Sequence, residues 1–139
     1  MKAGSGAALQ LRGCTKAFKG KGGLRQRMHE VEQQLAAVHR QMRRLKDDSR
    51  TIRGKVFALE TYVRHGGEAV MLRWRYLVGR HAIWERDIQP SLDRFPAELQ
   101  AWYRRANVAS VILNVQERCL RYERSALQRL LEWLRAGEE

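Results

Sequence analysis

Hydrophobic residues recur at helical spacing in the first half of the chain. Alternately four and three residues apart lie Leu24, Met28, Val31, Leu35, Val38, Met42 and Leu45. This heptad seam is typical of a coiled coil and predicts a long helix beginning at residue 24. The spacing continues formally to Val63, so one helix of about 40 residues is an alternative. We reject it because Asp47, Asp48 and Ser49 compete for backbone hydrogen bonds and residues 56–63 are rich in strand formers.

A second long stripe occupies the C-terminal part of the chain. Pro96 suits the first position of a helix, and Gly137 suits its end. Between them an apolar stripe, interrupted by Gln116 and Glu123, contains Leu99, Trp102, Ala106, Ala109, Leu113, Leu120, Leu127, Leu130 and Leu134. The predicted helix of about 40 residues is longer than the first helix can cover. Its remaining surface must contact the hairpin described next, the N-terminal segment or a second copy of the chain.

Between the two helices the hydrophobic period changes to two. Two runs rich in β-branched and aromatic residues flank Gly66–Gly67 and predict a β-hairpin over about residues 55–78. The strands are expected at 55–63 and 68–78. In the second strand one apolar face carries Val70, Leu72, Trp74, Tyr76 and Val78, and the opposite face carries Met71, Arg73, Arg75 and Leu77. The apolar face should dock on the helices, which leaves the two arginines pointing at solvent or at a ligand.

Two less regular segments complete the chain. Residues 79–87 are expected to start a short helix containing Ile83 and Trp84, which Gln89, Pro90 and Ser91 would break. Residues 1–23 are rich in glycine and lysine and predict a flexible basic segment with a short helical turn at 9–18, followed by a loop. The expected fold is mostly α: one domain over residues 24–135, built from two long antiparallel helices with an inserted two-stranded β-hairpin.

The charge of the chain is strongly positive and unevenly distributed. The formal net charge is +12, and residues 1–53 hold 13 basic and 4 acidic groups. Such an asymmetry favours a polyanionic partner, with DNA ahead of RNA and both ahead of an acidic protein or a membrane surface. A solvated basic surface without a partner is the plainer alternative.

Three groups of cations are candidate nucleic-acid contacts. The first surrounds the second strand and comprises Arg73, Arg75 and Arg80, with His81 beside them. The second lies on the first helix and comprises Arg40, Arg43 and Arg44, followed by Lys46, Arg50 and Arg53. The third is N-terminal and comprises Lys16, Lys19 and Lys21, followed by Arg25 and Arg27. Arginine suits this role because its planar fork binds phosphate oxygens or guanine edges in pairs. For each group, the alternative is an exposed face that only keeps the protein dissolved.

The sequence does not suggest catalysis. Its four histidines and two cysteines lack metal-ligand spacings, no serine sits in a nucleophile elbow, and the carboxylates are scattered. We therefore expect neither an enzyme nor a cofactor or metal. Trp102 is expected in the core, although it could instead join Arg104 and Arg105 at the surface. The longest uncharged run, residues 106–116, is too short for a membrane span, and no signal peptide is evident. A cytoplasmic protein follows by default.

Three short motifs carry a family resemblance. The chain reads KAFKGKGGL at Lys16–Leu24, LRWRYL at Leu72–Leu77 and VILNVQ at Val111–Gln116. Together they resemble an uncharacterised family of small proteins encoded on integrative and conjugative elements of bacteria, over about residues 9–130. The resemblance implies no activity and no site residues. It implies a mobile-element setting, in which DNA handling is common.

These observations lead to one expected function and one alternative. We expect a non-enzymatic nucleic-acid-binding accessory protein that contacts mainly phosphates. Neutralising about six phosphates of duplex DNA would give a slope near −5 for the logarithm of affinity against the logarithm of salt concentration. The alternative is a helical interaction module that forms a homodimer or docks a partner helix through its apolar stripes.

Overall fold

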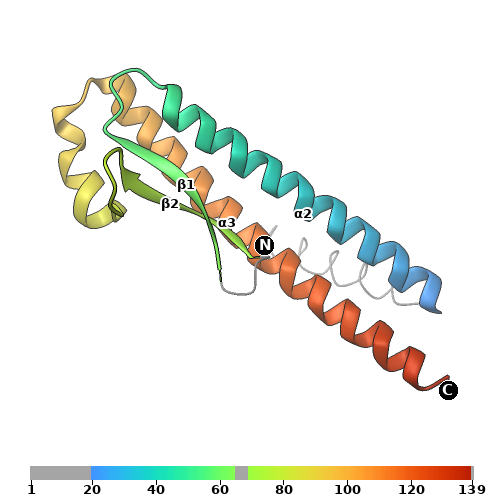
Figure 1. Cartoon of the computed structure of the whole chain (residues 1–139). Coiled ribbons are helices and arrows are strands. Elements are labelled where there is room, and N and C mark those ends of the chain that lie inside the picture. Colours follow the sequence, from blue (N-terminus) through green and yellow to red (C-terminus); the bar gives the residue numbers. More distant parts are fainter. Residues whose placement is uncertain (1–19, 65–68, 139) are drawn as a thin grey trace, which may run out of the picture. The chain divides into compact units, whose positions relative to one another are not determined.

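A computed structural model describes residues 20–64 and 69–138 (Figure 1). Its elements are α2 (Gly20–Thr51), β1 (Phe57–Val63), β2 (Val70–Tyr76), the π-helical turn η1 (Trp84–Ile88), the 3-10 turn η2 (Gln89–Arg94) and α3 (Ala97–Ala136). The prediction of a mostly α protein, with a β-hairpin inserted between two long antiparallel helices, is confirmed. The N-terminal turn expected at 9–18 lies outside the described residues.

The described residues form two compact units, and both long helices pass through both units. The first unit contains α2 up to Leu35 and α3 from Leu120 onward, and the second contains residues 36–119. In the first unit the buried side chains of Leu24, Val31 and Leu127 form the core. Beside that core, two guanidinium nitrogens of Arg27 donate to the two carboxylate oxygens of Glu123, at 2.6 and 2.8 Å.

The start of α2 corrects the expected loop. Residues 20–23 are helical, so α2 begins four residues before the predicted position. Leu24 is buried in the core of the first unit, and Lys21 forms an ion pair with Glu138 at the end of α3. Packing of the following turn therefore outweighs the poor helix propensity of three glycines. Gly20 is the first residue of α2 and has a φ of +75°, a conformation that glycine adopts readily.

The heptad seam of α2 is confirmed, and so is the end of the helix before the hairpin. Val31 and Met42 have no exposed surface, and Leu35 and Val38 are also buried. The helix ends at Thr51, whose hydroxyl donates to the carbonyl oxygen of Asp48. The backbone then turns through Gly54, at a φ of +76°, into the first strand.

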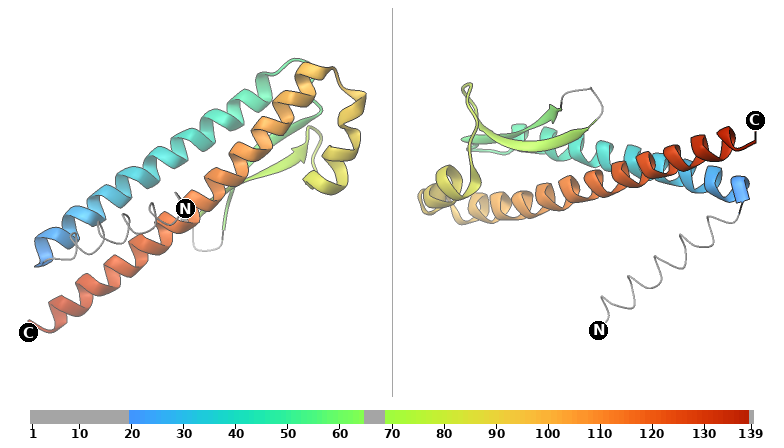
Figure 2. Two further views of the ribbon diagram at one scale, coloured as in Figure 1. Left: turned by 180° about the vertical axis from the view of Figure 1, so that it is seen from behind. Right: turned by 90° about the horizontal axis from the view of Figure 1, so that it is seen from below.

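The hairpin lies over one face of the helix pair within the second unit (Figure 2). Its strands pair antiparallel from Phe57–Tyr76 to Val63–Val70. Leu72 and Trp74 are buried toward the helices, while Arg73 and Arg75 lie on the opposite face, as the period of two predicts. Val78 corrects that prediction: its side chain is 89% exposed because β2 ends at Tyr76.

The outer edge of β2 is hydrogen-bonded at every second residue. From α3, a carboxylate oxygen of Glu117 accepts the Val70 N–H, and the Asn114 amide both accepts the Leu72 N–H and donates to the Leu72 carbonyl. Further along, the N–H of Ala82 donates to Trp74 and the N–H of Tyr76 donates to Arg80. Unpaired strand edges are costly when buried, and here polar side chains and a returning loop replace a third strand.

The first half of the outer edge of β1 is hydrogen-bonded by single side chains of both helices. The Tyr103 hydroxyl, fully buried on α3, accepts the Phe57 N–H at 3.1 Å and lies 3.2 Å from the Phe57 carbonyl oxygen, to which it donates. On α2, the Ser49 hydroxyl accepts the Leu59 N–H at 2.9 Å and donates to the carbonyl oxygen of Lys46. Ser49 and Tyr103 are thus buried polar groups with partners, as burial of a hydroxyl requires.

The connection from β2 to α3 differs from the prediction in two ways. The expected helix at 79–87 begins only at Trp84, because residues 80–82 hydrogen-bond to the edge of β2. The expected break at Gln89–Ser91 is a change of helix type, since η2 starts there with Pro90 in its first turn. Proline is tolerated in a first helical turn, where its missing N–H is not needed.

Candidate nucleic-acid interface

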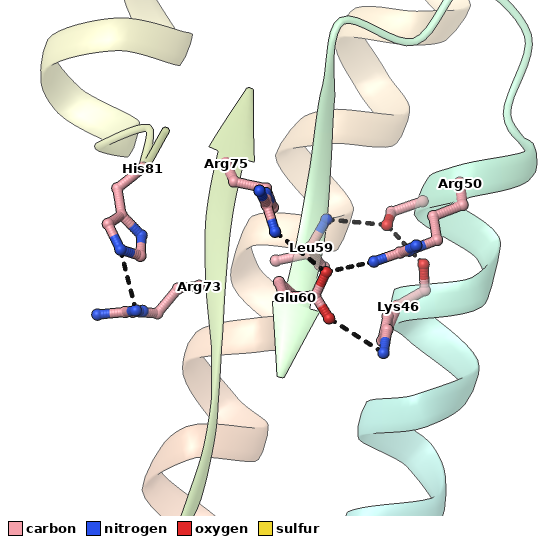
Figure 3. A network of polar contacts seen from close by, with 8 residues as sticks. Lys46, Arg50, Leu59, Glu60, Arg73, Arg75 and His81 are labelled. Atoms are coloured by element: carbon pink, nitrogen blue, oxygen red, sulfur yellow. Dashed lines mark hydrogen bonds and ion pairs between the residues drawn. The ribbon is translucent and has the colours of Figure 1, made fainter. Parts of the chain in front are cut away.

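Glu60 lies at the centre of a group of cations on the outer face of the hairpin (Figure 3). It pairs across the strands with Arg73, so its side chain projects on the face that carries the arginines. Lys46 and Arg50 of α2 and Arg75 of β2 all form ion pairs with its carboxylate, Lys46 at 3.0 Å and Arg75 at 3.5 Å. One carboxylate is therefore shared among three cationic side chains.

The electrostatic balance at Glu60 is visible in its pKa. Partial burial would raise the pKa of this carboxyl, but the hydrogen bond from Lys46 and the charges of Arg50, Lys46 and Arg75 outweigh that effect and hold the pKa below its usual value. Glu60 therefore stays ionised, and the surrounding cations retain an excess of positive charge at neutral pH.

Arg73 is held in place by two aromatic rings. Its guanidinium carbon lies 3.8 Å from the centre of the Tyr62 ring, a cation–π contact. A terminal guanidinium nitrogen lies 3.1 Å from Nε2 of His81, and because arginine can only donate, Nε2 accepts. The Nε of Arg73 is buried and has no hydrogen-bond partner among the described residues. This arginine is thus oriented without being neutralised by a carboxylate from that part of the chain.

The loop after β2 closes this face on one side. Gly79 has a φ of +87°, which lets the chain return so that Arg75 and His81 form an isolated bridge. The guanidinium of Arg80 then lies over the Tyr76 ring, 4.6 Å from its centre. Strands and loop together enclose a pocket of about 180 Å³, lined by Glu60, Thr61, Tyr62, Arg73, Trp74, Arg75, Gly79, Arg80 and His81.

A row of cations on α2 extends this surface. Arg43, Lys46 and Arg50 are spaced by three and four residues, which places them on one side of the helix, the side that contacts Glu60. We define the cationic face as Arg43, Lys46, Arg50, Arg73, Arg75 and Arg80. Among the described residues, Glu60 is the one carboxylate that forms ion pairs with these side chains, so six positive charges meet one negative charge.

The structure brings together only some of the predicted contact residues. Arg73, Arg75 and Arg80 line one pocket. Arg40 and Arg44 are exposed on α2, but Arg44 lines a different, mostly apolar pocket with Ile112 and Gln116 of α3. Arg40, Arg43 and Arg44 are all exposed on one side of α2, and their common role in binding stays a prediction. Lys21 is paired with Glu138 in the first unit. Lys16 and Lys19 lie outside the described residues.

Sequence reasoning missed Glu60 and Tyr62 as parts of this site. Both alternate with Phe57 and Leu59, which are buried, so they share the outer face of β1. The period of two could have placed them there, but only the strand register puts Glu60 opposite Arg73. Lys46 and Arg50 were expected in a helical patch, and their approach to the hairpin depends on tertiary packing.

Two apolar features lie elsewhere in the second unit. An exposed stripe on α3 consists of Val108, Val111, Ile112 and Val115, each about half exposed. Trp102, expected in the core, is only half buried and lines a pocket of about 810 Å³ with Arg53 and Arg105. Tyr103, its neighbour, takes the central position in the core instead.

Comparison of the chain with protein-family models, curated proteins and solved structures finds no match. The resemblance to the mobile-element family therefore stays a prediction. In residues 20–64 and 69–138, no helix has an apolar stretch that could cross a bilayer. Over the same ranges, His, Cys, Asp and Glu side chains form no group of three that could hold a metal ion.

Proposed function

We propose that this protein binds nucleic acid, DNA in preference to RNA, through phosphate contacts made by the cationic face. The observation that carries the proposal is the excess of cations around Glu60, with three ion pairs to one carboxylate and Arg73 and Arg80 beside them. Arginine and lysine that neutralise phosphates release condensed counterions, and this release drives binding without reading sequence. No catalytic step is included in the proposal.

The rigidity of the surface supports this function. Arg73 and Arg80 are each positioned by an aromatic ring, and the hairpin that carries the arginines is bonded along both edges to the helices or the loop. Side chains held in this way lose less conformational entropy when they bind a phosphate than free arginines would. The outward-facing donors of β2, its following loop and α2 could then contact several phosphates of one duplex.

The first experiment measures duplex affinity by fluorescence anisotropy at several salt concentrations. If the face neutralises about five phosphates, the log–log slope of affinity against salt should be about −4.5. A slope between 0 and −1 would contradict binding through this surface, because the counterion contribution would then be absent.

A pair of double variants tests the location of the site. Arg73→Ala combined with Arg75→Ala should weaken binding about tenfold or more and bring the slope about two units closer to zero. Arg104→Ala combined with Arg105→Ala removes the same charge from exposed positions of α3 and should change affinity much less. Equal losses in both variants would mean that total charge, and not the cationic face, determines binding.

The exposed stripe Val108, Val111, Ile112 and Val115 favours the second candidate, a helical interaction module. Exposed apolar patches on a helix often mark contacts between proteins. Light scattering on the same samples distinguishes the two functions. A monomer with salt-dependent affinity supports nucleic-acid binding, whereas a stable dimer without affinity for DNA or RNA supports the interaction module.

A further inference from the structure

The pocket beside β2 is large enough to hold a phosphate group. Its volume is about 180 Å³, and its lining includes three of the arginines of the cationic face. The chemistry of these side chains indicates which kind of phosphate the pocket suits.

The donors around the pocket match a phosphate that has three free oxygens. Arg73, Arg75 and Arg80 all line it, and each guanidinium carries several N–H groups. The Nε–H of Arg73, which also lines the pocket, is buried and lacks a hydrogen-bond partner among the described residues. A phosphate monoester carries a charge of about −1.5 to −2 and three acceptor oxygens, whereas a phosphodiester inside a strand carries one charge and two such oxygens.

We propose that this pocket binds a terminal phosphate monoester, and that on a nucleic acid it recognises the phosphorylated end of a strand. The second part rests on the proposed function. Tyr62 and His81 orient Arg73 beneath the phosphate, and the ion pair of Arg75 with Glu60 keeps a second guanidinium at the wall. The remaining cations of the face, on α2, contact the phosphodiesters that follow.

The test compares two oligonucleotides that differ only in their end. A 20-mer with a 5′-phosphate and the same 20-mer with a 5′-hydroxyl group are titrated with the protein, both single-stranded and as duplexes. The phosphorylated end should bind at least about fivefold more tightly. Inorganic phosphate at millimolar concentration should compete with the phosphorylated strand. Sodium chloride at the same ionic strength should compete less.

Variants that keep charge but lose the planar fork locate the preference. Arg73→Lys should reduce the preference to less than twofold while retaining binding to the 5′-hydroxyl strand, because lysine binds phosphate only as a point charge. Arg43→Lys, outside the pocket, should keep the preference. If Arg73→Lys lowers the melting temperature, Arg80→Lys in the exposed loop gives the same readout.

The outcomes separate this inference from the proposed function. Equal, salt-dependent affinity for both ends overturns the terminal-phosphate site and leaves nucleic-acid binding in place. No affinity for either strand overturns the proposed function and the strand-end assignment together. In that case, changes in the NMR signals of His81 and the Arg73 side chain on adding inorganic phosphate would still support a phosphate monoester pocket, and unchanged signals would overturn it.

Discussion

Asn114 carries the most sharply defined contact between α3 and the hairpin. Its side-chain oxygen lies 2.8 Å from the Leu72 nitrogen, and its side-chain nitrogen lies 3.0 Å from the Leu72 oxygen. Leu72 itself is only 3% exposed. Replacing Asn114 with Ala removes both hydrogen bonds and leaves two backbone groups of a buried residue without partners.

The expected cost follows from those two groups. Each unsatisfied buried donor or acceptor costs about 1–3 kcal/mol. Because both hydrogen bonds are only partly buried, about 1–2 kcal/mol applies to each, so Asn114→Ala should lower the free energy of unfolding by about 2–4 kcal/mol. Domains of this size are stable by only about 5–15 kcal/mol, so the loss is a large fraction of the total. With a urea dependence of about 2 kcal/mol per molar, the unfolding midpoint should fall by about 1–2 M.

Urea unfolding followed by far-UV circular dichroism measures this shift. Val115→Ala is the matched control, because the neighbouring side chain is 49% exposed and its truncation should change stability by less than about 0.5 kcal/mol. A midpoint for Asn114→Ala within about 0.3 M of the wild-type value, with an unchanged slope, would refute the reasoning. It would mean that water replaces the side-chain amide at the strand edge at little cost.

Two further predictions concern the connection from β2 to α3, with a glycine of α2 as a control. Gly79→Ala should destabilise the protein by about 1–2 kcal/mol and weaken nucleic-acid binding, because its φ of +87° strains any residue with a Cβ although the space around it is open. Gly22→Ala, in open space within α2, should instead stabilise the protein by about 0.5–1 kcal/mol. If the two substitutions shift the thermal unfolding temperature in the same direction, backbone strain at Gly79 is not the cause. The hydrogen bonds from Arg86 and from the N–H of Ile83 lower the pKa of Asp87 to about 2. The ionised carboxylate should therefore stabilise the turn at pH values above its ordinary pKa, and this stabilisation should be lost as the pH falls toward 2. An NMR titration of the Ile83 amide should therefore have its midpoint near 2, and a midpoint at the ordinary 3.8 would contradict the assignment.

The regular elements could be predicted from the sequence because each has a strong period. The seam of α2 and the alternation around Arg73 and Arg75 follow from hydrophobic spacing alone, and both are confirmed. The start of α2 could not be predicted, because three glycines argue against a helix and the stabilising contacts of Leu24 and Lys21 are tertiary. Local propensity fails where tertiary packing decides.

The arginines of the candidate site could be predicted from the sequence, but the full set of residues that form it could not. Arg73, Arg75 and Arg80 are close in sequence, and a strand with its following loop brings them together. Glu60 joins them only through the strand register, and Lys46 only through the packing of α2 on the hairpin. Tyr103 shows the same limit: its central position depends on a hydroxyl that bonds to a strand edge, which no periodicity reveals.

The bonded edges of the hairpin determine how another molecule can approach it. Ser49 and Tyr103 already use the outward amides of Leu59 and Phe57 on β1, and Asn114 and Glu117 use those of Leu72 and Val70 on β2. A foreign peptide therefore finds these edge positions occupied, which hinders extension of the sheet there. Recognition at this hairpin must use its exposed side chains, so its specificity can change by point substitution without altering the scaffold.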